Sequence, residues 1–478
     1  MTEKESEKQI FQITKKDIFF LILAFLTLAV FCITAYYGCT LEGLEPNGQK
    51  MIGILFMAAI LWVTEPIPLP VTGLLIIVLQ PILHIFEPTE VFSSFGNQAV
   101  FFLIGAFIIA AAIEKHNLHK RIALLFLSRF DQNPRLFTLG IMLSCAFLSF
   151  VMPEHGVAAL FLPIVISILV AMKIVPKKSN FGKISMLCVA YGCSIGSLGT
   201  LIGGARNPLA IAQLANEGII VGFFDWMIIS VPIVLISLPL VWIILQFTFP
   251  IELNDITEAK KEIQSQVKET GKIKQKELLV LLVLITTIIG WILFSNYIYI
   301  GLAVIAILGA FALFIFGCVT WKDVEKRVPW GIILLYGGAI TLGYGILHSG
   351  AGAYIASQII NFSSFNLYLM ILLMIVITVL LTNIMSNVAA VAIILPIGIS
   401  ISKNVLGLSP YLATMLIALS GGLAFMLVIS TPGNAITYSA GYYSTKDLFK
   451  AGVLANILCV AVIFVVAIVY WINVLNLG

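Results

Sequence analysis

Four short polar segments interrupt the long apolar stretches of this 478-residue chain. They are Pro153-Glu154-His155-Gly156, Gly204-Ala205-Arg206-Asn207, Ser386-Asn387-Val388 and Thr431-Pro432-Gly433-Asn434. Where a helix is interrupted inside a membrane, backbone N–H groups at the next helix start can bind an anion, and the freed carbonyl oxygens can bind a cation. These four segments therefore hold the candidate ligand-binding residues.

The first two segments carry three ionisable residues, Glu154, His155 and Arg206. An ionisable side chain at the middle of a bilayer costs roughly 2.5–3.5 kcal/mol, so a functional role is the default interpretation. The structural alternative is a Glu154–Arg206 ion pair that holds two helices together. Such a pair does not exclude a function, because a paired arginine can still face the carboxylate of a substrate.

The four segments belong to a sequence duplication. Residues 152–163 align with 385–396 at a shift of 233 positions, and residues 203–207 align with 430–434 at a shift of 227. A single interruption could simply permit a turn and close helix packing. Two at matched positions favour a secondary transporter with its site between the repeats.

Composition places the chain in the membrane. Hydrophobic residues make up 60% and charged residues 10%, against roughly 45–50% and 25% in soluble domains, and the mean hydropathy is +1.08. The seven Cys include no C-x-x-C pair, so we predict neither a disulfide framework, a metal site nor a cofactor. Residues 192–196 match G-x-S-x-G but lie in an apolar helix, which disfavours a nucleophile elbow. The prediction is a polytopic carrier with no catalytic residue and no nucleic-acid partner; a membrane enzyme is a remote alternative.

The apolar segments predict an all-α membrane protein with two re-entrant helical hairpins and two broken helices. The pairs 136–152/155–172 and 366–385/388–402 have links too short for separate spans, so each is predicted to turn back inside the membrane, where it must be buried or line a cavity. The other predicted segments are 18–37, 51–64, 68–86, 97–114, 183–202, 228–249, 277–295, 297–317, 330–347, 410–429 and 452–475, with short pieces at 207–216 and 435–443.

Basic residues predict the orientation. With a cytoplasmic N-terminus, 24 of the 27 Lys and Arg lie on inward-facing segments, and the remaining three are Lys50, Lys403 and Arg206. This bias follows the positive-inside rule. It predicts a multi-pass protein of the cell (inner or plasma) membrane with an extracytoplasmic C-terminus. The open ends of the two hairpins then face opposite sides, so the repeats are inverted.

Several motifs carry a family resemblance. Ser386-Asn387-Val388 keeps two of the three residues of a Ser-Asn-Thr hairpin tip, and Thr431-Pro432-Gly433-Asn434 is close to a Thr-Pro-Pro-Asn break. Residues 441–452, residues 199–203 and Asn207 also fit the pattern. Together they resemble the divalent anion/sodium symporter family, the carriers of succinate, malate, 2-oxoglutarate, citrate and sulfate, over nearly the whole chain.

The resemblance implies a homodimer in which a transport part slides against a fixed scaffold like an elevator, with each hairpin tip holding one end of the substrate. It implies five regions: scaffold helices 1–120, a transport part 121–249, a charged cytoplasmic linker 250–276, scaffold helices 277–349 and a transport part 350–478. The predicted substrate-binding residues are His155, Gly156, Gly204, Arg206, Asn207, Ser386, Asn387, Val388, Thr431, Pro432, Gly433 and Asn434.

The departures from the family pattern decide the predicted coupling. In the family, each Ser-Asn-Thr tip and its facing break form one sodium site, but the first tip here has lost all three residues and its break contains Arg206. We expect Arg206, together with His155, to replace the charge of sodium, while Glu154 needs Arg206 or a proton to avoid repelling a carboxylate. A fixed cation cannot couple transport to a sodium gradient, and it leaves the empty carrier charged.

The predicted function is therefore sodium-independent, obligatory exchange of small dicarboxylates (succinate, malate, fumarate or 2-oxoglutarate). The alternatives are a di- or tricarboxylate symporter coupled to sodium through the second site or to protons through Glu154 or His155, and, more remotely, an anion channel.

Overall fold

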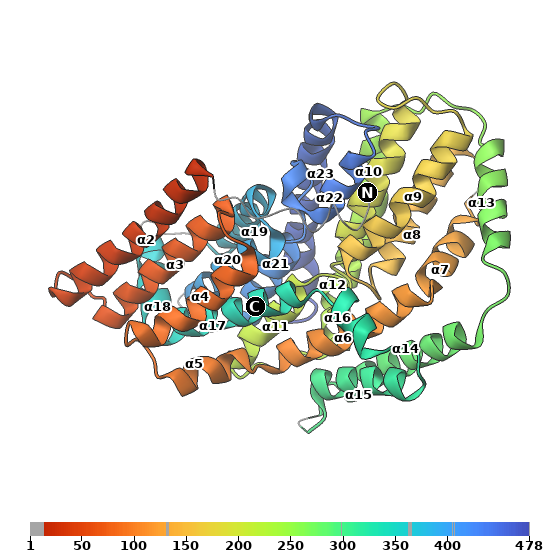
Figure 1. The fold of residues 1–478 in the computed structure, drawn as a ribbon. Helices are drawn as coiled ribbons and strands as arrows, with labels where there is room; N and C mark the ends of the chain where they lie inside the picture. Colours follow the sequence, from red (N-terminus) through yellow and green to blue (C-terminus); the bar gives the residue numbers. More distant parts are fainter. Residues whose placement is uncertain are drawn as a thin grey trace.

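The computed structural model describes residues 14–130, 133–297, 299–361, 366–403, 405 and 407–477. Every regular element in these ranges is a helix (Figure 1). Nine helical stretches of the described chain are long and apolar enough to cross a membrane. The predicted all-α polytopic class is confirmed.

The helices of the first half run in sequence order as α2 Lys15–Tyr36, α3 Pro46–Thr64, α4 Leu69–Ile82, α5 Pro88–Phe95, α6 Gln98–Lys115, α7 Leu118–Leu127, α8 Pro134–Leu148, α9 Glu154–Ala171, α10 Asn180–Gly196, α11 Arg206–Asn216 and α12 Phe223–Thr248. Those that follow are α13 Thr257–Glu269, α14 Gln275–Phe294, α15 Gly301–Ile315, α16 Trp321–Arg327, α17 Trp330–His348, α18 Ala351–Asn361, α19 Leu367–Ile384, α20 Asn387–Ser402, α21 Pro410–Ser420, α22 Pro432–Ser439 and α23 Thr445–Val466. The short helices α5, α7, α16 and α18 lie outside the predicted apolar segments.

Each predicted hairpin is present as two helices joined by a short turn. In the first, α8 and α9 are linked by residues 149–153; in the second, α19 and α20 are linked by Met385 and Ser386. The turn of the second hairpin is fixed by capping, because the side chain of Ser386 accepts a hydrogen bond from the N–H of Ala389. The first lacks a side-chain cap, and the N–H of Glu154 donates instead to the carbonyl of Gly203.

The helix interruptions are longer than predicted. α10 ends at Gly196 and α21 at Ser420, whereas the apolar segments predicted helices up to residues 202 and 429. The prediction was wrong because the apolar sequence continues after the helical backbone has ended. Within the first break the chain passes too close to its neighbour for a side chain, because a Cβ at Gly203 would lie 2.2 Å from the carbonyl oxygen of Ser149.

Helices of the first half pack closely against helices of the second half. α4 of the first half packs on α17 of the second, and α6 of the first half packs on α15. Glycines allow both contacts, because a Cβ at Gly338 would lie 2.3 Å from the Cα of Gly73, and a Cβ at Gly105 would lie 2.5 Å from the backbone of Ala306. Small residues at such crossings let backbones approach closely, as is typical of membrane helices.

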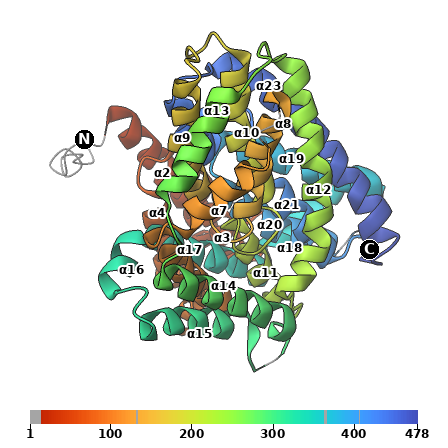
Figure 2. The ribbon, with the colours of Figure 1, turned by 90° about the vertical axis from the view of Figure 1, so that its right-hand side faces the viewer.

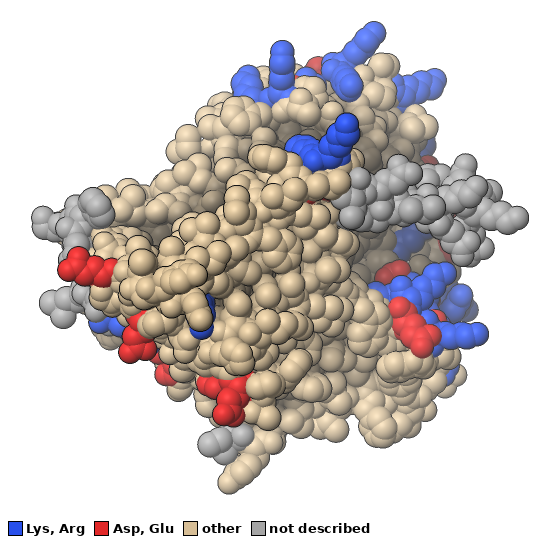
Figure 3. All heavy atoms as spheres, turned by 60° about the vertical axis from the view of Figure 1, so that its left-hand side comes forward, with Lys and Arg blue, Asp and Glu red and all other residues tan. Residues whose placement is uncertain are grey.

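Ion pairs join segments that the orientation analysis assigned to the same side. They are Lys115–Asp323 at 2.7 Å and Lys183–Asp447 at 3.0 Å on the predicted inner side, and Lys403–Glu217 at 2.7 Å on the predicted outer side. In Figure 3 most visible Lys and Arg lie along the upper and right-hand edges, whereas acidic side chains dominate the lower left. Each pair thus lies within one predicted side, and the assignment of these sides to the cytoplasm and the exterior stays a prediction.

The charged segment 250–276 is not simply a solvated linker. It forms α13, which packs along α9 and α7 (Figure 2). Ala259 and Ile263 are buried there, and Gln266 Nε2 donates to Ser167 Oγ of α9 at 2.5 Å. The alternating charges occupy only the outer face of this helix.

The inverted topology leads to a labelling prediction. In Ser179→Cys and Val405→Cys variants of a cysteine-free background, a membrane-impermeant maleimide should label position 405 from outside and position 179 only after permeabilisation. The reason is that the hairpins open on opposite sides. Labelling of both positions from the same side would contradict the inverted repeat.

Candidate functional site

A cavity of about 180 Å³ lies where the four polar segments meet. Its lining residues are Leu69, Pro153, Glu154, His155, Gly203, Ala205, Arg206, Ile332, Leu335, Ser386, Asn387, Val388, Ser430 and Pro432. The two hairpin tips and the two breaks, which lie up to 280 positions apart in the sequence, thus surround one space. The apolar residues come from α4 and α17.

Four helices begin at this cavity. α9 begins at Glu154, α20 at Asn387, α11 at Arg206 and α22 at Pro432, and all four residues line the space. A helix N-terminus presents unpaired N–H groups and a positive partial charge, so it favours an anion. Their convergence makes the cavity suited to an anionic ligand.

Arg206 and Glu154 are linked through a serine. Arg206 Nη2 donates to Ser197 Oγ at 2.9 Å. The single hydroxyl proton of Ser197 lies within hydrogen-bonding distance of Glu154 Oε2, at 2.8 Å, and of the carbonyl of Ser194, at 2.7 Å. The direct distance from Arg206 Nη1 to Glu154 Oε2 is 3.7 Å. Asn387 Nδ2 of the second hairpin donates to Glu154 Oε1 at 3.4 Å. The carboxylate of Glu154 therefore lies between the two hairpin tips.

The guanidinium of Arg206 is held in a fixed place. Its side chain is 1% exposed, and two glycines make room for it. A Cβ at Gly422 would lie 2.1 Å from Arg206 Nη2, and a Cβ at Gly204 would lie 2.7 Å from Nη1. Within the described part of the chain, Nε has no hydrogen-bond partner.

The second tip is also engaged. Ser386 caps α20, and Asn387 Oδ1 accepts from Thr382 Oγ1 at 2.7 Å while its Nδ2 donates to Glu154. Both residues line the cavity with Val388. His155 lines it as well, and its side chain makes no hydrogen bond to the described residues.

Two asparagines hold the helix breaks in shape. Asn207 Nδ2 donates to the carbonyls of Ser197 and Thr200, at 2.8 and 2.7 Å. In the second repeat, Asn434 Nδ2 donates to the carbonyls of Ala424 and Leu427, at 2.9 and 3.0 Å. Each of these carbonyls accepts one hydrogen bond and keeps a second lone pair. The Oδ1 atoms of Asn207 and Asn434 are buried and have no hydrogen-bond partner among the described residues.

The other predicted site residues lie behind the cavity. Thr431 caps α22 by accepting from the N–H of Asn434, and Gly433 is buried. Gly156, Gly204, Asn207, Thr431, Gly433 and Asn434 are absent from the cavity lining.

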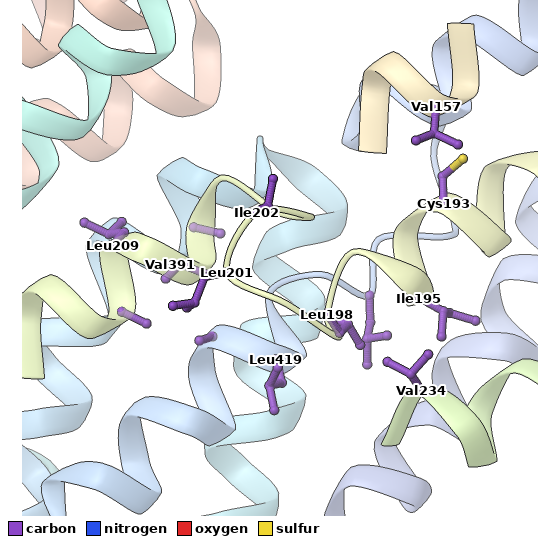
Figure 4. Close-up of a cluster of buried hydrophobic side chains, with 14 of the residues drawn as sticks. Val157, Cys193, Ile195, Leu198, Leu201, Ile202, Leu209, Val234, Val391 and Leu419 are labelled. Atoms are coloured by element: carbon purple, nitrogen blue, oxygen red, sulfur yellow. The ribbon is translucent and has the colours of Figure 1, made fainter. Parts of the chain in front are cut away.

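Figure 4 shows the apolar packing around the first break, where Leu198 and Leu201 lie with Val234, Val391 and Leu419 from other helices. These residues support the site without lining it.

Sequence reasoning missed three residues that shape the site. Ser197 bridges the two charges, Thr382 orients Asn387, and Gly422 admits the guanidinium. Ser197 and Gly422 follow the last residues of α10 and α21 closely, so a correct prediction of those helix ends would have exposed them as candidates.

Comparison with known proteins decides the family. Residues 20–477 match the family model described as the sodium:sulfate symporter transmembrane region. The chain belongs to this family. It is 31% identical over 464 residues to the sodium-dependent dicarboxylate transporter SdcS of Staphylococcus aureus strain USA300, covering 91% of this chain and 88% of the relative. The family is one of transporters and not of enzymes, and the predicted resemblance is confirmed.

Two solved structures share the fold of this family member. MtrF of Neisseria gonorrhoeae, described among antimetabolite efflux pumps, aligns with a TM-score of 0.58 at 12% identity, over 94% of this chain and 95% of its own. The YdaH transporter of Alcanivorax borkumensis, described as having an unusual topology, aligns with a TM-score of 0.50 at 14% identity, over 78% and 85%. At these identities the likeness concerns the fold alone.

The contacts at the second tip lead to a binding prediction. The double variant Ser386→Ala/Asn387→Ala should weaken dicarboxylate binding roughly tenfold, because donors to a charged ligand are lost. Isothermal titration of the purified carrier measures this affinity. Ser402→Ala is the matched control, since it removes a buried hydroxyl from the far end of the same helix, where its one hydrogen bond among the described residues goes to the carbonyl of Ile399. An unchanged affinity in the double variant would make the tip purely structural.

The Arg206–Glu154 contact leads to a paired-mutant prediction. Arg206→Ala should abolish transport and also cost about 3–5 kcal/mol of stability, because the Glu154 carboxylate remains buried without its partner. Adding Glu154→Gln should recover the thermal stability but not the transport. Thermal unfolding and vesicle uptake measure the two effects separately. Full sodium-free transport by the double variant would mean that Arg206 serves only to neutralise Glu154.

Proposed function

We propose that this chain is a sodium-independent secondary carrier of small dicarboxylates, such as succinate, malate, fumarate or 2-oxoglutarate, and that it exchanges one for another. The observation that carries the proposal is the guanidinium of Arg206, buried beside a cavity at which four helices begin. Such a cavity favours an anion, and its positive charge is part of the protein.

The substrate class is supported by size and by the relatives. The cavity, at about 180 Å³, is below the roughly 300–1,000 Å³ of sites for drug-sized ligands, so it suits a small anion. The Staphylococcus aureus relative is a dicarboxylate transporter by its description. Polar groups from both hairpins, Arg206 on one side and the Ser386–Asn387 tip on the other, could each hold one carboxylate.

Sodium independence is supported by the ligands that are missing from the first tip and by the fixed charge of Arg206 beside it. Pro153 and the two ionisable residues after it replace a hydroxyl–amide–hydroxyl tip. The description of the relative as sodium-dependent makes this the most distinctive part of the proposal.

The exchange mode has one revised premise. The charge of Arg206 alone would oppose movement of the empty carrier, but Glu154 lies close enough to neutralise it. A carrier without a dissociable cation has no sodium gradient to use, so accumulation of one dicarboxylate depends on the gradient of another. Because the neutralised site still lets the empty carrier cross, exchange is proposed as the faster mode and empty return as the slower one.

An elevator movement and a homodimer complete the proposal. The apolar wall of the cavity is formed by Leu69 of α4 and by Ile332 and Leu335 of α17, which belong to the proposed scaffold. In the second repeat, α17 packs on α20, the second helix of its hairpin. In the first repeat, α6 corresponds to α17 and α9 to α20, but α6 has no comparable contact with α9 among the described residues. This difference between the repeats is expected if the transport part is at one end of its movement along the scaffold.

The proposal is tested in proteoliposomes. Uptake of labelled dicarboxylate in sodium-free buffer should be strongly accelerated by unlabelled dicarboxylate inside the vesicles, because the carrier then returns loaded. Vesicles without internal substrate and vesicles without protein are the controls. A strict requirement for sodium, with no effect of internal substrate, would restore a symporter; non-saturable flux without counterflow would indicate a channel.

A further inference from the structure

Glu154 already occupies the groups expected to bind one end of the substrate. Its Oε2 accepts from Ser197 Oγ and lies 3.7 Å from the Arg206 guanidinium, and its Oε1 accepts from Asn387. The protein thus places a carboxylate of its own against the donors of a cavity suited to carboxylates.

We propose that Glu154 is a tethered counter-anion of the substrate-free carrier, which a substrate carboxylate displaces from Arg206, Ser197 and Asn387 and which takes up a proton from water as it leaves the guanidinium. This inference rests on the proposed function, because it requires a dicarboxylate to bind in this cavity. It goes further, because it makes Glu154 the residue that sets the ratio of exchange to net uptake.

The geometry allows Glu154 to leave while Arg206 stays. Glu154 is 12% exposed and lines the cavity, and its contacts with Asn387 and Arg206, at 3.4 and 3.7 Å, are long for charge-assisted hydrogen bonds. Beside it, a Cβ at Gly156 would meet only Met152 Cε, at 3.8 Å. Arg206 is enclosed between two glycine positions and cannot follow.

The charges around the cavity show what displacement changes. The titratable groups that face Glu154 are Arg206 of α11, His155 beside it on α9 and Tyr336 of α17, while α10, α20 and α22 contribute neutral groups. With Glu154 ionised and in place, the positive charge of Arg206 is balanced, so the empty carrier can cross. With a neutral residue at position 154, the empty carrier would carry a lone buried guanidinium, which disfavours crossing.

The test compares wild type with Glu154→Gln. The variant should bind dicarboxylate about tenfold more tightly, because no internal carboxylate competes for the charged donors. Its net uptake into substrate-free vesicles should fall, while its exchange against internal dicarboxylate should persist. The raised ratio of exchange to net uptake is an effect that a merely structural residue would not produce.

Two further variants keep the test decisive. Ser197→Ala removes a hydroxyl that both Glu154 and the substrate use, so it should weaken dicarboxylate binding. Because it also loosens Glu154 from Arg206, it should still raise the ratio of exchange to net uptake, even if Glu154→Gln folds poorly. Glu217→Gln is the matched control, because Glu217 is also a poorly exposed carboxylate with a basic partner, Lys403, but lies away from the cavity; it should change neither quantity.

The outcomes separate this inference from the proposed function. If wild type exchanges dicarboxylates without sodium but Glu154→Gln and Ser197→Ala leave affinity and ratio unchanged, or lower exchange and net uptake equally, the tethered counter-anion is wrong and the proposed function stands. If wild type does not bind dicarboxylates, both are wrong.

Discussion

A buried guanidinium at the meeting point of four helix starts is the constraint on which the site depends. Arg206 is almost fully buried, and a desolvated charge is tolerated only when it is compensated and hydrogen-bonded. Ser197 and Glu154 provide that compensation from the first repeat, and Asn387 reaches the same carboxylate from the second. The hairpins are thereby positioned by the charge they surround, as well as by their apolar packing.

The two repeats share a backbone device but differ in charge. Asn207 and Asn434 each bind two carbonyls of the preceding break, so the same amide clamp shapes both interruptions. The tips have diverged: the first carries Glu154 and His155, and the second carries Ser386 and Asn387. The shared backbone clamp explains why the two repeats contribute similar shapes to the cavity. The sequence differences between them explain why its arginine, Arg206, comes from the first repeat.

Most of the fold could be predicted from the sequence, because apolar length and the duplicated segments report helices and hairpins directly. The second hairpin was located to within a residue, since a polar tip in an apolar hairpin is a strong local signal. In the first hairpin α8 ends at Leu148, four residues before the predicted end. The ends of α10 and α21 could not be predicted, because the apolar sequence continues past both of them. Ser197 and Gly422 were missed because their contacts with Arg206 arise from tertiary packing that no local pattern encodes.

The close packing of first-half helices on second-half helices has a consequence for biosynthesis. Gly73 of α4 and Gly105 of α6 make close backbone contacts with α17 and α15, which follow more than 180 residues later in the sequence. Until those helices have entered the bilayer, the first half has no partner for its closest backbone contacts. The first half is therefore expected to form an incompletely packed intermediate in the membrane. Correct packing of its helices then requires correct insertion of the second half.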